Sequence, residues 1–252
     1  MEQEVTLQKQ QAFARALQTT SPAGGIGTLG EKSVHAVLKR YCEPLGCMHE
    51  YRVGKYVADI VNEDGITEIQ TAHFSALPGK LEAFLHEVPV TLVHPVIRHL
   101  YLCRVDGATG ALTGRSRSPK TGQYTDTFWE LYRILPYLYH PNFTLRLLLL
   151  DAEEIRVQTD RVRRGRNVQE KGDRVPLALV GEYECKTPAD YIGLLPPLPD
   201  VFTAAEFARG LRRSQKRAAF ALSFCKKLGI VEACGTRGRA YLYRVVSPGE
   251  QC

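Results

Sequence analysis

The stretch VADIVNEDGITEIQT, residues 57–71, contains two short apolar runs joined by an Asn-Glu-Asp-Gly turn. Apolar runs on either side of such a turn predict an antiparallel β-hairpin. Asp59 interrupts the first strand, and Glu68 and Gln70 interrupt the second. Because alternate residues of a strand share a face, Asp59 is expected to meet Glu68 and Gln70 on one face of the hairpin.

Two carboxylates on a half-buried face repel each other and lose their hydration, so another group must compensate them. A divalent cation does so directly, since Mg²⁺ prefers oxygen ligands and takes one or two carboxylates together with water and phosphate oxygens. The alternative is that Asp59 and Glu68 form exposed cross-strand pairs with Lys or Arg neighbours. The residues alone leave both interpretations open.

The flanking sequence predicts a mixed sheet covered by helices. Apolar residues at helical spacing indicate helices, and short apolar runs between turns indicate strands. An α/β domain with helices on both faces of a mixed sheet is the simplest arrangement of these elements. The predicted helices are 31–41, 76–88 and 126–138, and the predicted strands are 49–54, 56–61, 66–71, 90–97, 101–105 and 143–157.

A third acid precedes the hairpin on the predicted helix 31–41. Glu31 lies seven residues before Leu38, about 20° away around a helix, so it is placed at the edge of the apolar face. His35 lies on the same edge one turn later.

This order of elements and acids resembles the PD-(D/E)xK nuclease superfamily, the fold of many restriction enzymes and Holliday-junction resolvases. The resemblance covers roughly residues 29–105 and implies a restriction-endonuclease-like domain. Glu31 matches the acid on the helix, Asp59 the central aspartate, and Glu68 the glutamate of the Glu-x-Lys motif. Gln70 stands where the family usually has lysine, although some restriction enzymes carry Glu-x-Gln, and Ala58 replaces the usual proline.

The resemblance implies metal-dependent hydrolysis of phosphodiester bonds. Asp59, Glu68, Glu31 and the carbonyl of Ile69 would hold Mg²⁺ or Mn²⁺, and the metal would activate a water molecule. Gln70 cannot supply the charge of lysine, but it can orient the attacking water. Lys80 or His35 is a candidate for the missing positive charge.

The C-terminal residues carry all the excess positive charge of the chain. Residues 203–246 contain ten Lys or Arg and two acids, whereas the whole chain has a net charge of +6. Thr203 and Glu206 form a capping-box pattern at the start of one helix, Ser214 can cap a second helix, and Gly229 is placed to end it. Two strands follow around the turn GTRGR.

This order of helix, tight turn, helix and basic hairpin resembles a winged helix-turn-helix. Such a resemblance implies that the first turn of the second helix meets DNA bases and phosphates, while the hairpin contacts the backbone or the minor groove. Small winged helices also serve as protein-interaction modules, which is the alternative. The predicted DNA-binding residues are Arg212, Arg213, Ser214, Gln215, Lys216, Arg217, Arg237 and Arg239.

The remaining sequence limits the other possibilities. The first twenty residues are polar and lack the apolar segment of a secretory signal, and no apolar run is long enough to span a membrane. Seven scattered cysteines without a zinc-site spacing predict reduced thiols in a cytoplasmic protein. The Gly-rich stretch 21–30 has neither a preceding strand nor a Gly-Lys-Ser/Thr sequence, so it does not indicate a phosphate-binding loop.

Two linking segments complete the predicted organisation. Residues 161–174 contain six bases and two acids without apolar periodicity, which predicts either a mobile surface loop or a loop that contacts phosphates. The Pro-rich segment 194–200 is the best domain boundary. We therefore expect an N-terminal helical segment (1–25), a nuclease-like domain (26–195) and a winged helix (200–247).

The sequence as a whole predicts a metal-dependent DNA endonuclease that is anchored by its C-terminal winged helix. Its partner would be duplex or branched DNA and not a membrane. Cutting both strands of a duplex favours a homodimer. The alternative is a non-catalytic DNA-binding regulator that retains a degenerate nuclease fold as a scaffold.

Overall fold

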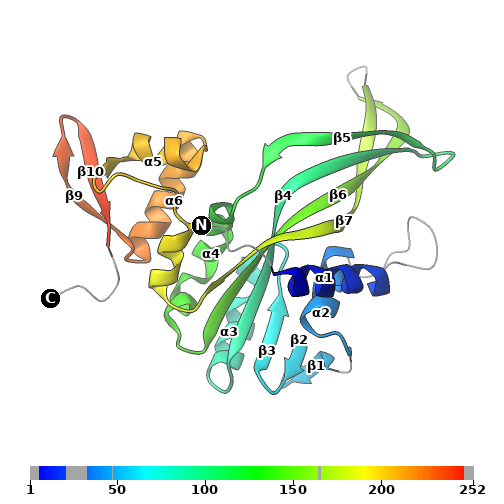
Figure 1. The fold of residues 1–252 in the computed structure, drawn as a ribbon, viewed down its shortest axis with the longest axis horizontal. Coiled ribbons are helices and arrows are strands. Elements are labelled where there is room, and N and C mark those ends of the chain that lie inside the picture. The colour runs from blue at the N-terminus through cyan, green and yellow to red at the C-terminus, as the bar shows by residue number, and fades with distance from the viewer. Residues whose placement is uncertain (1–5, 21–32, 47, 164–165, 247–252) are drawn as a thin grey trace.

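A computed structural model describes residues 6–20, 33–46, 48–163 and 166–246, and its main feature is a seven-stranded mixed sheet. The strand order is β1-β2-β3-β4-β6-β7, with β5 paired to β4 as well (Figure 1). The first three strands are antiparallel, β3 and β6 are both parallel to β4, and β7 is antiparallel to β6. The strands are β1 (His49–Val53), β2 (Tyr56–Asn62), β3 (Gly65–Ile69), β4 (Val90–Asp106), β5 (Leu112–Thr121), β6 (Phe143–Arg163) and β7 (Arg166–Cys185).

The hairpin predicted from residues 57–71 is present. Asn62 pairs with Gly65, and Ile60 pairs with Thr67. Gly65 has a positive φ of 117°, and a Cβ at this position would lie 2.3 Å from the carbonyl oxygen of Pro89. Only glycine fits both the backbone conformation and the close approach, so the turn fixes how β3 enters the sheet beside β4.

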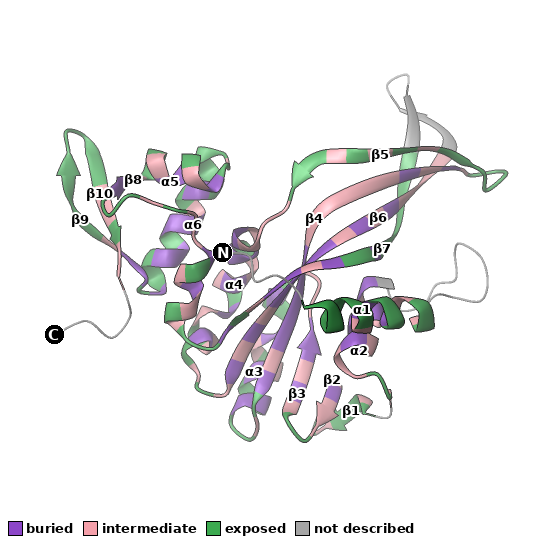
Figure 2. Cartoon of the chain, in the orientation of Figure 1, coloured by how far each residue is buried: buried purple, intermediate pink, exposed green. Residues whose placement is uncertain are grey.

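Helices cover both faces of the sheet, as the sequence predicts. On one face, α1 (Leu7–Thr20) and α2 (Ser33–Cys42) pack through Phe13, Val37 and Leu38 onto a core that includes Ile60, Val93 and Leu148. On the other face, α3 (Pro78–Leu85) packs through Leu81 and Phe84. The buried residues of the central strands form the layer between these helices (Figure 2).

The outer parts of the sheet differ from the sequence prediction. The runs predicted as two strands, 90–97 and 101–105, belong to the single strand β4, and β5 was not predicted. The prediction of a loop over residues 161–174 is wrong for most of that segment, because β6 continues to Arg163 and β7 begins at Arg166. These polar strands lack apolar alternation, and backbone pairing with neighbouring strands forms them instead.

The helix predicted over 126–138 is broken into three short pieces. They are η2 (Tyr124–Thr127), α4 (Phe128–Leu131) and η3 (Tyr132–Tyr139), of which η2 and η3 are 3₁₀ helices. Ile134 has the non-helical angles φ −120° and ψ 19°, and Pro136 lies inside the last piece. Proline lacks an amide hydrogen and collides with the preceding turn, so a regular α-helix cannot continue through this position.

The C-terminal residues form the predicted sequence of helix, tight turn, helix and hairpin. The capping box joins Thr203 to Glu206, and Arg212 ends α5 in a left-handed conformation. Ser214 precedes α6, and Gly229, with a φ of 75°, follows its end. The elements are β8 (Phe202–Thr203), α5 (Ala204–Leu211), α6 (Gln215–Lys227), β9 (Val231–Arg237) and β10 (Ala240–Val245), and the strands form a second sheet in the order β8-β10-β9.

The hydrophobic core is continuous between the large sheet and this C-terminal unit. The segment 195–201 joins η4 (Pro188–Leu194) to β8, where the sequence places a domain boundary. One buried cluster nevertheless contains residues of α3, α4, β6, α5 and α6. Phe128 of α4 stacks on Phe224 of α6 with ring centroids 4.7 Å apart. The C-terminal unit therefore packs directly on α4.

Two further observations concern the described residues. None of their helices combines the length and the apolar character needed to cross a lipid bilayer. Cys42, Cys103, Cys185, Cys225 and Cys234 are free thiols.

Candidate functional site

The strands β2 and β3 separate at the acidic pair. Their regular pairing includes Ile60 and Thr67, and the next residues toward the open end are Asp59 and Glu68. The backbone N–H of Ile69 donates to the Asp59 carboxylate at 2.8 Å, and the backbone N–H of Asp59 donates to the Glu68 carboxylate at 3.4 Å. The two carboxylates thus lie together in the gap between the strands.

Each carboxylate has a basic partner from a different face of the sheet. His35 Nε2, on α2, lies 3.3 Å from Asp59 Oδ2, and Lys80 Nζ, on α3, donates to Glu68 Oε2 at 2.7 Å. These are the two residues that the sequence suggests as substitutes for the missing lysine. The side chain of Glu68 is only 2% exposed, so an exposed cross-strand pair does not describe this residue.

The two carboxyl groups respond differently to this environment. Burial tends to raise the pKa of Asp59, but hydrogen bonds from His35 and Ile69, and the charges of His35 and Lys80, hold it below its usual value. Burial and the nearby charge of Asp59 raise the pKa of Glu68, and Lys80 offsets only part of this effect. Glu68 is therefore the more easily protonated member of the pair.

Gln70 is held by local hydrogen bonds. Its side-chain amide donates to the carbonyl of Ala72, and its own carbonyl accepts a hydrogen bond from His94 Nδ1 at 2.6 Å. Its N–H donates to the carbonyl of Val93 in the parallel ladder. The next donor along β4 would be residue 95, which is a proline and has no N–H, so the His94 side chain satisfies the Gln70 carbonyl.

The oxygen atoms at the site suit a hard cation. Asp59 and Glu68 supply carboxylates, and the Ile69 carbonyl lies on the same strand edge as the Ile69 N–H that contacts Asp59. Within the described ranges, no group of three or more His, Cys, Asp or Glu side chains is arranged to hold a metal. Glu31, the third predicted ligand, lies outside the described residues, so its position relative to this pair is a prediction.

The predicted DNA-binding residues are arranged on the C-terminal unit in two ways. Arg212, Ser214, Gln215, Lys216 and Arg217 are exposed at the turn and at the start of α6, and Arg237 and Arg239 are exposed at the hairpin. Arg213 instead holds the unit to the body. Its guanidinium donates to both carboxylate oxygens of Asp126, at 2.8 and 2.6 Å, and to the Thr121 carbonyl at 2.8 Å.

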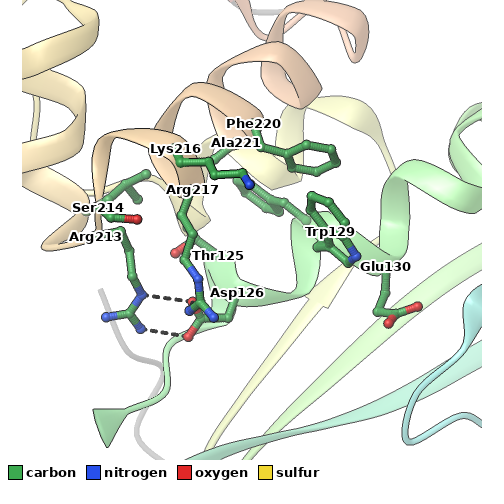
Figure 3. Close-up of a pocket in the computed structure, with 12 residues that line it drawn as sticks. Thr125, Asp126, Trp129, Glu130, Arg213, Ser214, Lys216, Arg217, Phe220 and Ala221 are labelled. Atoms are coloured by element: carbon green, nitrogen blue, oxygen red, sulfur yellow. Dashed lines mark hydrogen bonds and ion pairs between the residues drawn. The ribbon is translucent and has the colours of Figure 1, made fainter.

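A pocket of about 570 Å³ opens between α4 and the start of α6. Trp129 and Phe220 lie at one end of it with ring centroids 4.3 Å apart, and Arg213 and Asp126 are paired at the other end (Figure 3). Lys216 and Arg217 also line this pocket. The aromatic part was missed in the sequence, where Trp129 is one apolar residue of a predicted amphipathic helix.

Two smaller hollows follow this pocket, each sharing lining residues with the one before it. The first, of about 410 Å³, shares Arg213 and Arg217 with the pocket and adds Lys120 and Arg174. The second, of about 320 Å³, shares Arg174 and reaches Val34, Thr71 and Ala72. The lining of this second hollow also contains Lys171, Glu154 and Asp173, so its charges are mixed. Lys120 and Arg174 lie in segments that were not predicted as strands.

The fold and these residues define a mixed α/β protein with an acidic pair, in which Glu68 is buried and Asp59 half-buried, and a basic C-terminal unit. The family described as "Domain of unknown function (DUF8091)" matches residues 32–186, more than half of the chain. The chain belongs to this family. The match contains Asp59, Glu68 and Lys80 and ends before the C-terminal unit.

One relative extends beyond the family match. A protein of Treponema pallidum (strain Nichols), described as an uncharacterized protein, is 30% identical over 230 residues, which cover 89% of each chain. No solved structure matches the chain.

Proposed function

We propose that the protein is a metal-dependent DNA endonuclease with a restriction-endonuclease-like body and a C-terminal winged helix. One observation carries this proposal: the Asp59 and Glu68 carboxylates meet where two strands separate, beside the backbone of Ile69. The order α2, β1, β2, β3, α3, β4 around this pair resembles the order of elements in the PD-(D/E)xK superfamily, which supports the proposal. Two carboxylates and a carbonyl form a donor set that fits Mg²⁺ or Mn²⁺.

The residues around the acidic pair have separable roles in this proposal. Asp59, Glu68 and the Ile69 carbonyl, with Glu31 as a further candidate, hold the cation. When bound, the cation lowers the pKa of a water molecule and stabilises negative charge on the phosphate. Binding of a cation would compete with the contacts that His35 and Lys80 make with Asp59 and Glu68.

Lys80 is the best candidate for the charge that the Glu-x-Gln motif lacks. Its ammonium group reaches Glu68 from α3, whereas the Gln70 side chain is bonded to the Ala72 carbonyl. After release from Glu68, Lys80 can donate a hydrogen bond to a phosphate oxygen or orient the attacking water. Gln70 then acts as a positioning residue that holds the end of β3 beside Val93 and His94.

The C-terminal unit supplies DNA binding in this proposal. Lys216 and Arg217 are exposed in the first turn of α6, where a recognition helix contacts base edges and phosphates. Arg237 and Arg239 occupy the hairpin that corresponds to the wing. Arg213 orients the unit through Asp126 and contributes its charge to the surface beside Arg174. Duplex or branched DNA is the proposed partner, and a homodimer would place two sites on a duplex.

Cleavage of supercoiled, linear and branched DNA with Mg²⁺ or Mn²⁺ tests the proposal. Asp59→Asn and Glu68→Gln should each lower cleavage by at least about a hundredfold, because each removes a charged metal ligand. DNA binding, measured by fluorescence anisotropy, should remain. Glu63→Gln is the matched control, since Glu63 is an exposed acid in the turn of the same hairpin. Cleavage that survives in both site variants would contradict the proposal.

A second candidate function is a non-catalytic DNA-binding regulator. The pairing of His35 with Asp59 and of Lys80 with Glu68 favours it, because these contacts already stabilise the buried acids without a metal. In that case the wild-type protein binds DNA and cuts none of the three substrates. Asp59→Asn would then leave binding unchanged, while Lys216→Ala with Arg217→Ala would weaken it.

A further inference from the structure

The pocket between α4 and α6 combines one exposed aromatic ring with exposed positive charge. Trp129 is 54% exposed, although its ring lies against Phe220, which in turn lies 5.2 Å from Tyr132. A large aromatic ring that remains in water beside other aromatic rings provides a surface for stacking. Lys216 and Arg217 line the same pocket and are exposed.

The two acids of the pocket are engaged by other groups. Asp126 accepts two hydrogen bonds from the Arg213 guanidinium, at 2.8 and 2.6 Å, and lies 3.9 Å from Arg217. Glu130 accepts the backbone N–H of Phe74 at 2.9 Å, and its carboxylate points away from the Trp129 and Phe220 rings in Figure 3. The surface beside the rings is therefore left with the positive charges of Lys216 and Arg217.

We propose that this pocket binds an unpaired nucleotide of single-stranded DNA. The base stacks on Trp129 and Phe220, and Lys216 and Arg217 contact the phosphates on either side of it. Aromatic stacking with basic residues along the backbone is how proteins bind single strands without strong sequence preference. A volume of about 570 Å³ is within the range of small-molecule sites and accommodates one nucleotide.

The same pocket discriminates against fully paired DNA. In a duplex, each base is covered on both faces by its neighbours, so the indole of Trp129 can stack on a base only where the duplex is open. This inference rests on the proposed DNA-binding function and makes it more specific. It assigns gapped, branched or single-stranded DNA as the substrate class, and the hollow lined by Arg217 and Arg174 offers further positive charge beside the pocket.

Trp129 is the only tryptophan of the chain, so its fluorescence reports directly on this pocket. The full-length protein is titrated with a twelve-nucleotide single-stranded DNA, the blunt duplex of the same sequence and the corresponding RNA. The expected result is saturable quenching by the single-stranded DNA and at least about tenfold weaker quenching by the duplex. Stacking of one base is large enough for this difference.

Variants separate stacking from charge. Binding of labelled single-stranded DNA, followed by anisotropy, should weaken at least about fivefold in Trp129→Ala and in Lys216→Ala. Trp129→Tyr should retain most of the affinity, which distinguishes stacking from a loss of folding. Tyr51→Ala is the matched control, because Tyr51 is 57% exposed on β1 and lies outside the pocket.

Three outcomes would overturn this inference. They are equal quenching by duplex and single strand, quenching by RNA alone, and an unchanged affinity in both Trp129→Ala and Lys216→Ala. If the duplex binds by anisotropy without any quenching by single-stranded DNA, the pocket assignment fails and the DNA-binding proposal stands. If neither form of DNA binds, the DNA-binding proposal itself fails.

Discussion

The acidic pair of the body and the basic residues of α6 are held in opposite ways. Asp59 and Glu68 are mostly buried and already paired with His35 and Lys80. Lys216 and Arg217 are exposed at the start of a helix that is itself anchored by Phe224. A ligand must therefore displace protein groups at the acidic pair, whereas a phosphate can reach the basic residues directly. Under the proposed function, binding by α6 is therefore expected to precede cation binding at the acidic pair.

The largest expected effect tests whether the two regions belong to one folding unit. Phe224 is fully buried and stacks on Phe128, so Phe224→Ala should lower the free energy of unfolding by about 3–5 kcal/mol. Urea unfolding followed by both circular dichroism and Trp129 fluorescence should show one shared transition. Cys234→Ala, at an exposed position, is expected to change little. Two separate transitions, with that of the body unaffected, would show that the regions fold independently.

The next effect concerns the positive charge at the acidic pair. Lys80→Ala should reduce DNA cleavage by about a hundredfold or more, because it removes the ammonium group that lies 2.7 Å from Glu68. Adding Gln70→Lys to this variant should restore part of the activity by placing a lysine in the usual position of the motif. Lys55→Ala, at an exposed position, serves as the control. Full activity of Lys80→Ala would remove Lys80 from the mechanism.

A smaller effect is expected at the basic surface. The double change Lys216→Ala with Arg217→Ala should weaken duplex binding by about tenfold at moderate salt and lower the slope of log affinity against log salt by about two. Its control is Lys55→Ala with Lys186→Ala, which removes two exposed charges from the body. An unchanged salt slope would mean that α6 does not contact the phosphates.

The smallest effect separates stability from function at the acidic pair. The folded-state pKa of Glu68 is raised, so its ionised form costs stability once the pH rises through that value. Glu68→Gln should therefore stabilise the metal-free protein at pH 7, by less than about 2 kcal/mol, and this advantage should shrink as the pH falls. Asp59 has the opposite sign: its lowered pKa contributes stability that is lost in acid. Urea unfolding of Glu68→Gln and Asp59→Asn at pH 7 and pH 4 measures the change in unfolding free energy for each variant. A destabilised Glu68→Gln protein at pH 7 would contradict the prediction for Glu68.

The sequence predicts those parts of the fold that local chemistry determines. The turn at Gly65 and the capping box at Thr203 need only nearby residues, and both are present. The strand β5 was not predicted, because its sequence has little apolar alternation. It forms by pairing with β4, which the local sequence does not reveal. The helix breaks near Ile134 because of Pro136. The apolar residues around this proline have helical spacing, so the sequence predicts a continuous helix there.

The candidate site shows the same division between local and tertiary information. Strand alternation predicts that Asp59 lies near Glu68. In the structure the backbone N–H of Asp59 donates to the Glu68 carboxylate. The partners His35 and Lys80 come from helices on opposite faces, so only the tertiary fold determines which acid each one meets. Trp129 gave no comparable signal, since its exposure depends on how α6 packs against α4.

The core shared by α4 and α6 has a consequence for how this protein can change during evolution. The C-terminal unit packs Phe224 against Phe128, so replacing this unit would expose an apolar surface on the body. Substitutions on either side of that contact must therefore compensate one another.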